Sequence, residues 1–247
     1  MMKKMKPLHK ALALALGLGA ASPAFAVGSL DPNLLGGVQS AFDAMTKDLT
    51  SALSYKAVAP AASTGMIGFE VDAAVGITEA ANVSQWGQAI GDTSLDYLPV
   101  PKVIARKGLP LGLEVGGVYS TVPGSNIKYW GAEVKYNVLG GNLAMPALAV
   151  RGAYTKLQGV DLLDFSTKSL DVSVSKGFLF FTPYAGVGKV WGTATPDASL
   201  VGLSEASSNV SKLFAGLHIG LGLFKLGAEW DKTGDATTYS LKLGLGL

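Results

Sequence analysis

The stretch that decides the fold is Ile67–Thr78, which reads IGFEVDAAVGIT. Its odd-numbered positions are all apolar, whereas its even-numbered positions are small or polar and include Glu70 and Asp72. Because successive side chains of a strand point to opposite faces, this alternation predicts a strand with one apolar and one polar face. The same alternation recurs in Trp130–Val138, which reads WGAEVKYNV.

Ten segments with this alternation follow Gly65, and they predict ten strands. The expected bounds are 66–78, 98–107, 111–120, 127–138, 145–156, 168–177, 180–192, 211–221, 223–231 and 237–247. Pro99 and Pro101 interrupt the second segment and Lys189 interrupts the seventh, so an eight-stranded barrel is the alternative if either fails. Longer polar connections such as 79–96 alternate with tight ones such as 107–110, as they do when both chain ends lie on one side of a barrel.

The composition indicates a membrane protein without helical spans. Mean hydropathy is +0.34, yet no run of about 18 apolar residues follows residue 26. The chain has 32 Gly without a collagen period, and it has no Cys, which excludes a disulfide framework. Strands that alternate between lipid and lumen have this composition. We therefore expect an all-β fold, an antiparallel transmembrane β-barrel over residues 64–247.

Residues 1–26 have the form of a secretory signal peptide, with a lysine-rich start, an apolar run and the cleavage pattern Ala24-Phe25-Ala26. Removing them takes four of the 20 basic residues and none of the 18 acidic ones, which leaves a formal net charge of −2. No basic stripe with interleaved aromatic residues remains, which argues against a nucleic-acid partner. An exported β-barrel is expected in the outer membrane of a Gram-negative bacterium.

Residues 27–63 differ from the rest of the mature chain. Apolar residues recur there at three- and four-residue spacing, which predicts an amphipathic helix over 31–55 that begins at Asp31-Pro32. Since this segment precedes the first strand, we expect it on the periplasmic side. Its apolar stripe, from Leu34 to Leu53, must be buried in the lumen, on the inner leaflet or on a partner. We favour a plug or periplasmic lid whose polar side pairs with lumen charges through Asp43, Lys47 and Asp48.

Aromatic residues lie on lipid-facing positions near the strand ends, as in the interfacial girdles of membrane barrels. One expected girdle, near the outer ends, consists of Tyr119, Trp130, Tyr154, Trp230 and Tyr239. A second, near the inner ends, consists of Phe178, Phe224 and Tyr136.

The last strand points Tyr239, Leu241, Leu243, Leu245 and Leu247 outward. In this it resembles bacterial outer-membrane β-barrels, whose amphipathic last strand is recognised by the barrel-assembly machinery, although Leu247 stands where those proteins usually have Phe. The stretches LPVPK (98–102), VPGS (122–125), FTPYAGVG (181–188) and DKTGD (231–235) resemble a family of short proteobacterial outer-membrane proteins of unassigned function. That resemblance implies an outer-membrane location and a β-barrel fold, and it assigns a functional role to no residue of this chain.

Inward-facing charged residues form a mixed-charge lumen in which acids and bases neutralise one another. The expected members are Glu70, Asp72, Lys102, Arg106, Glu114, Glu133, Lys135, Arg151, Asp171, His218, Glu229 and Lys242. Glu70 and Asp72 have the spacing of an acid and base pair, but a structural network is the stronger interpretation. His218 has Gly rather than Ser two residues on, so we expect a hydrogen-bonded lumen histidine. No catalytic residue, metal site or cofactor is predicted.

A ten-stranded lumen is only slightly wider than the eight-stranded case that side chains fill, which argues against a large aqueous pore. Three functions remain open. They are a narrow or helix-plugged channel for a small solute, a structural or adhesive barrel that presents loop anchors such as Trp86, and a lipid-modifying enzyme. We favour them in that order, because no convincing catalytic constellation is present. The expected partners are outer-membrane lipid, the barrel-assembly machinery and a small solute in the lumen.

Overall fold

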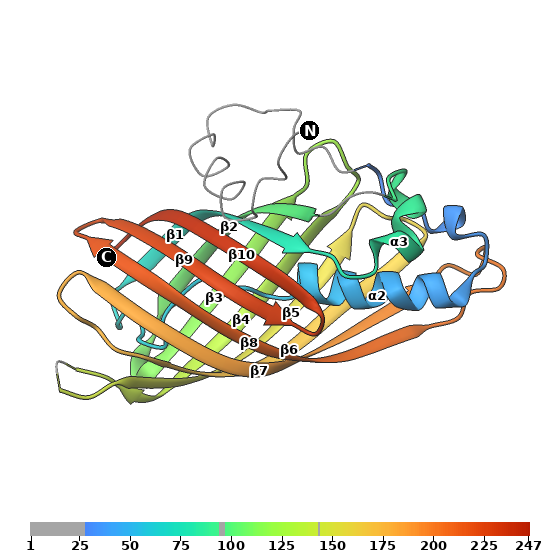
Figure 1. Cartoon of the computed structure of the whole chain (residues 1–247). Coiled ribbons are helices and arrows are strands. Elements are labelled where there is room, and N and C mark those ends of the chain that lie inside the picture. The colour runs from blue at the N-terminus through green and yellow to red at the C-terminus, as the bar shows by residue number, and fades with distance from the viewer. Residues whose placement is uncertain (1–27, 94–96, 143) are drawn as a thin grey trace, which may run out of the picture.

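The computed structural model describes residues 28–93, 97–142 and 144–247. The expected signal peptide at 1–26 lies outside these residues. Within them the chain forms a closed barrel of ten antiparallel strands, in which neighbours in sequence pair and β1 pairs with β10 (Figure 1). The predicted ten-stranded fold is confirmed, and the eight-stranded alternative is wrong.

The strand bounds lie close to those expected from the alternation. They are β1 (Phe69–Glu79), β2 (Tyr97–Gly108), β3 (Leu113–Thr121), β4 (Lys128–Gly140), β5 (Ala147–Gln158), β6 (Leu163–Ser175), β7 (Phe181–Pro196), β8 (Ala206–Leu221), β9 (Phe224–Thr233) and β10 (Ala236–Gly246). Pro99 and Pro101 are tolerated because they lie where β2 pairs with β1 alone, since β3 pairs only with Val103–Gly108. Lys189 is tolerated because its side chain is exposed on the outward face of β7.

Three neighbouring strands are longer than predicted, all at the same end of the barrel. β6 begins at Leu163 rather than 168, β7 ends at Pro196 rather than 192, and β8 begins at Ala206 rather than 211. The added residues pair with one another, with Leu163 opposite Pro196 and Ala194 opposite Ala206. One side of the barrel wall therefore extends beyond the rest.

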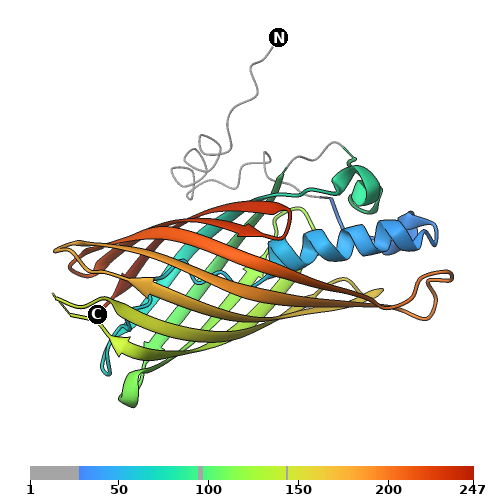
Figure 2. The same ribbon diagram turned by 60° about the horizontal axis from the view of Figure 1, so that its bottom comes forward.

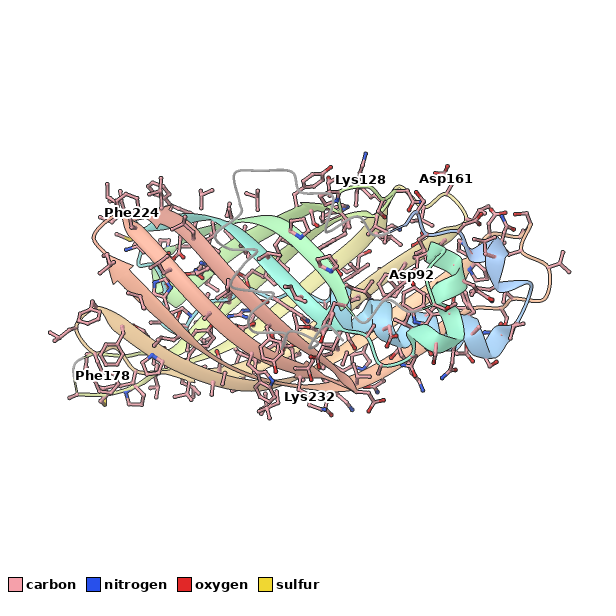
Figure 3. All side chains as sticks on the ribbon, turned by 45° about the horizontal axis from the view of Figure 1, so that its top comes forward. Asp92, Lys128, Asp161, Phe178, Phe224 and Lys232 are labelled. Carbon is pink, nitrogen blue, oxygen red and sulfur yellow. The ribbon has the colours of Figure 1, made fainter. Side chains whose placement is uncertain are left out.

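The two ends of the barrel carry different connections. At the end we call the terminal end, β1 starts and β10 ends, and the β2–β3 connection contains η4 (Pro110–Gly112). At the opposite end, the loop end, the β1–β2 connection contains α3 (Val83–Trp86) and η3 (Gly87–Ile90). Figure 3 shows Phe178 and Phe224 at the terminal end and Lys128 and Asp161 at the loop end.

The N-terminal segment forms two helices, η2 (Pro32–Leu35) and α2 (Gln39–Leu53). The side chain of Asp31 caps the first of them by accepting a backbone N–H, as the sequence predicted. Gly36 and Gly37 lie between the helices with φ of 59° and 76°. Such angles are readily adopted by glycine, so the helix expected over 31–55 is broken at this pair.

α2 lies in the mouth of the barrel at the loop end, against the extended β7 and β8 (Figures 1 and 2). The predicted position on the side where β1 starts is therefore wrong. The linker at 54–68 runs back through the lumen to β1, and a chain of that length reaches about 50 Å when extended. Sequence order thus does not fix the end at which the helix docks. Among the described residues, no helix is long and apolar enough to cross a membrane.

Candidate functional site

The lumen has two zones, and the zone at the loop end is apolar. Phe42, Met45 and Leu49 of α2 are at most 2% exposed there. They belong to one core cluster with inward-facing residues of the wall, among them Ile104, Val118, Tyr129, Leu157 and Phe165. The predicted burial of the apolar stripe is confirmed for these residues, whereas Leu34 is 53% exposed.

The polar side of α2 binds the β1–β2 connection rather than the wall charges. The carboxylate of Asp48 accepts hydrogen bonds from the backbone N–H of Asn82 at 2.9 Å and from Trp86 Nε1 at 2.8 Å. Asp43 and Lys47 are exposed. The predicted pairing of these three α2 residues with lumen charges is wrong, because the helix lies beyond the charged zone. Trp86 is only 1% exposed, so its predicted role as an exposed loop anchor is wrong too.

The second zone is lined by charged side chains and filled by the linker. Wall side chains donate to linker carbonyls: Lys212 to Tyr55 O at 3.1 Å, Arg106 to Ala57 O at 2.7 Å, Asn137 to Ala61 O at 2.7 Å, and Lys135 to Pro60 O and Ala62 O at 3.2 and 3.1 Å. Lys56 of the linker adds an ion pair to Asp231 at 3.2 Å. Hydrogen bonds to its backbone carbonyls, together with this ion pair, therefore hold the linker in place.

The wall carboxylates and cations also pair with one another. Arg106 Nη2 lies 2.8 Å from both Glu70 Oε1 and Asp72 Oδ2, and Lys242 binds the same two carboxylates. The other wall pairs are Lys135–Glu114 at 2.8 Å, Arg151–Glu133 at 2.9 Å, Arg151–Asp171 at 3.9 Å, Lys212–Asp171 at 3.2 Å and Lys212–Asp231 at 4.0 Å. Charges removed from water need such partners. Glu70 and Asp72 thus lie in a four-membered ion cluster instead of forming an isolated acid and base pair.

The residues predicted for the lumen all lie on the inward face of the barrel. Of the twelve, eleven are buried and His218 is half-buried. Three further charged residues, Lys56, Lys212 and Asp231, are buried and paired but were not among the expected members. Lys212 and Asp231 lie at the edges of the expected strands and share the inward alternation, which could have identified them. Lys56 carried no such signal, because the linker has no period.

His218 stands apart from the ion pairs of the wall. Its Nδ1 is buried and has no hydrogen-bond partner among the described residues. The prediction that His218 is hydrogen-bonded is therefore wrong for that atom. Deeper in the lumen, Tyr184 donates to Glu229 at 2.9 Å. In the described part of the chain, no group of three or more His, Cys, Asp or Glu side chains could hold a metal ion.

The outward face carries aromatic residues near the loop end. Trp130 lies opposite Tyr119 and meets Tyr154 edge-on, with ring centroids 5.8 Å apart. Trp230 lies opposite Tyr239. Trp191, which is 40% exposed on the outward face of β7, is a further member that was not predicted.

Toward the terminal end the outward face is apolar and ends in a second aromatic group. Tyr136, Phe178 and Phe224 are all exposed there. On the last strand, Leu243, Leu245 and Leu247 are 47%, 53% and 65% exposed, and Tyr239 and Leu241 are partly exposed. An apolar belt between two aromatic groups is the arrangement expected of a barrel surrounded by lipid.

The fold and the site define a closed ten-stranded barrel whose lumen is occupied by its own N-terminal segment. No protein-family model and no curated protein matches the sequence. The resemblance to short proteobacterial outer-membrane proteins therefore stays a prediction.

Several solved structures are similar to the chain at low identity. The N-terminal β-barrel domain of Pseudomonas aeruginosa OprF is 14% identical, over 74% of this chain and 99% of that one, with a TM-score of 0.36. KdgM porin is 9% identical, over 71% and 98%, with a TM-score of 0.36. Ail, the attachment invasion locus protein of Yersinia pestis, is 12% identical, over 74% and 98%, with a TM-score of 0.32. At these values the likeness carries no argument about function, which must rest on the residues themselves.

Proposed function

We propose that this protein is an outer-membrane β-barrel of a Gram-negative bacterium whose lumen is a narrow path for a small solute, closed at rest by residues 28–64. The apolar belt between aromatic groups supports the membrane location. The loop end faces outward, since the chain ends of such barrels lie on the periplasmic side. Outer-membrane lipid surrounds the apolar belt, and the barrel-assembly machinery recognises the last strand.

The observation that carries the channel is that most of the wall charges pair with one another rather than with the linker. The exceptions among the described residues are Lys102 and Glu229, which form no ion pair, and Asp231, which lies closest to Lys56. Arg106, Lys135 and Arg151 each bind a wall carboxylate, and among the ion pairs of the described residues only Lys56–Asp231 joins wall and linker. The remaining polar contacts of the linker are hydrogen bonds with uncharged groups or with already paired wall charges, which water or a polar solute can replace. A buried charge left alone costs several kcal/mol. Because these wall charges keep their partners when the linker leaves, displacing the linker costs less free energy than it would if the linker supplied those partners.

The lining also defines the solute class. Acidic and basic wall groups alternate around the lumen, as in the cluster of Glu70, Asp72, Arg106 and Lys242. Small residues make room for these charged groups, since a Cβ at Gly244 would collide with the carboxylate of Asp72. A narrow lumen lined by both signs of charge suits a small polar or zwitterionic solute better than a strongly charged one.

A structural barrel that presents its loops is the second candidate. The cap formed by α2 and α3 at the loop end supports it, whereas the burial of Trp86 removes the anchor expected for adhesion. A lipid-modifying enzyme remains the least supported of the three functions, because the paired carboxylates are held by Arg106 and Lys242.

Single-channel recording in planar bilayers tests the proposal. A variant that lacks residues 28–64 and keeps 1–27 should conduct well above the intact protein, because it loses the segment that fills the lumen. Correct insertion is checked by heat-modifiable migration on gels. A truncated barrel that inserts correctly and conducts no more than the intact one would contradict the channel and favour the structural barrel.

A disulfide lock provides the matched control, since the chain has no Cys. A Cβ at Gly192 of β7 would lie 2.9 Å from Cβ of Thr50 of α2, somewhat closer than the roughly 3.5–4.5 Å of disulfides. The variant Thr50→Cys/Gly192→Cys should show fewer openings when oxidised and regain them on reduction. The two single-cysteine variants should not respond. Equal conductance in both redox states would mean that α2 does not move during opening.

A further inference from the structure

The outward face near the loop end contains a groove of about 740 Å³ that crosses β6 to β9. Apolar side chains, Leu170, Val172, Val187 and Leu213, line it together with Trp191, Lys189 and Lys232. We call it the outer groove. It lies on the outside of the wall and is separate from the lumen.

Three exposed lysines surround the outer groove. Lys168 lies opposite Trp191 in the ladder, and Lys189 is two residues from Trp191 on β7, so Lys168 and Lys189 are diagonal neighbours roughly 7–8 Å apart. Lys232 lies opposite Leu213 on the far side of β8. In the described part of the chain, none of the three lysine side chains forms an ion pair or hydrogen bond. Nearby Lys156, by contrast, pairs with Asp164 at 2.8 Å. The groove therefore has an uncompensated positive charge.

The outer groove is polar at one end and apolar at the other. From the lysines toward the terminal end, the outward positions of β6 are Leu170, Val172 and Val174, and those of β7 are Val187 and Ala185. Lysines on a lipid-facing surface are unfavourable in hydrocarbon, and clusters of them at an interface attract anionic lipid headgroups. The arrangement matches an amphiphile with an anionic head beside Trp191 and a chain along the apolar strip.

The spread of the lysines indicates more than one anionic group. Lys168 is on β6 and Lys232 is on β9, three strand spacings of about 4.8 Å away, and the pairing offsets them by four residues along the strands. Their backbones are therefore roughly 20 Å apart. One phosphate cannot contact all three ammonium groups unless the side chains converge. Two phosphates on one rigid headgroup can contact them in extended conformations.

We propose that the outer groove binds a doubly phosphorylated glycolipid of the leaflet at the loop end. Its phosphates lie against Lys168, Lys189 and Lys232, its sugar lies beside Trp191, and an acyl chain runs along Leu170, Val172 and Val187. This inference rests on the proposed outer-membrane location and is independent of the proposed channel.

Native mass spectrometry of the full barrel in detergent tests the proposal with three probes. They are bis-phosphorylated lipid A, its dephosphorylated form and phosphatidylglycerol. The intact protein should retain bis-phosphorylated lipid A more tightly than either other lipid, by on the order of tenfold or more. The groove variant, Lys168→Gln/Lys189→Gln/Lys232→Gln, should lose that preference.

The matched control removes the same charge from exposed lysines outside the groove, as Lys47→Gln/Lys107→Gln/Lys128→Gln. It should bind as the intact protein does. Equal losses in both triple variants, or equal retention of the dephosphorylated lipid, would overturn the proposal. Phosphatidylglycerol bound as tightly as lipid A would overturn the assignment to a doubly phosphorylated headgroup. Absence of the protein from outer-membrane fractions would overturn the location, whereas a failed conductance test leaves lipid binding as expected.

Discussion

Replacing Arg106 by Met tests whether the wall network stabilises the barrel. The Arg106 side chain is 1% exposed, lies 2.8 Å from both Glu70 and Asp72, and donates to the carbonyl of Ala57 at 2.7 Å. Methionine keeps most of the aliphatic stem and removes the charge. The two carboxylates then share Lys242, and the Ala57 carbonyl loses its donor.

The expected loss of stability follows from burial. Removing one partner of a buried ion pair costs about 3–5 kcal/mol, and an unpaired buried carbonyl costs on the order of 1 kcal/mol or more. Since Lys242 keeps part of the attraction, we expect Arg106→Met to lower the free energy of unfolding by about 3–5 kcal/mol in total. Lys156→Met is the control, because the Lys156–Asp164 pair is 38% and 60% exposed and such pairs contribute under about 1 kcal/mol.

Urea unfolding of the barrel in lipid vesicles, followed by tryptophan fluorescence, measures both variants. Arg106→Met combined with Asp72→Asn leaves Glu70 with Lys242, so the double variant should recover much of the loss. Arg106→Met with the stability of Lys156→Met would refute the reasoning. So would a double variant less stable than Arg106→Met alone.

Two further predictions concern the belt and the orientation. Leu243→Arg should lower stability by about 2–4 kcal/mol and abolish heat-modifiable migration, whereas Leu247→Arg at the terminal end should cost under about 1 kcal/mol; equal effects would contradict the belt. On intact cells, Asn33→Cys at the loop end should react with a membrane-impermeant maleimide and Leu179→Cys at the terminal end should not, since both positions are exposed and the chain has no other cysteine. Reversed labelling would mean the opposite orientation.

Strands and their faces were predictable because the alternation is local. The apolar or polar character of the neighbours one and two positions away predicts that a residue such as Glu133 or Lys135 points inward. This holds because successive side chains of a strand point to opposite faces. Neither Pro99 nor Lys189 disturbed the prediction, because one lies where β2 has a single partner and the other points outward.

The position of α2 was not predictable, because it depends on contacts distant in sequence. The linker has no period and is long enough to return from either end. What selects the loop end is the apolar inner surface there, with Phe165 and Tyr129, together with the bond from Trp86 to Asp48. α2 also packs on β7 and β8, two of the strands that extend beyond their predicted bounds.

The same geometry constrains how the lumen could open. The linker is tied at the loop end through α2 and Asp48, and at the terminal end through the covalent link to β1 and a hydrogen bond from the Thr64 N–H to Glu114 at 2.9 Å. With side chains, a helix is about 10 Å across, so α2 cannot readily withdraw through the charged zone that the extended linker already fills. If the proposed channel opens, we therefore expect α2 to leave the mouth at the loop end while the linker shifts along the wall. In that movement the buried Asp48 would lose its hydrogen bonds from Trp86 and Asn82, whereas the wall pairs of Arg106 and Arg151 would remain intact.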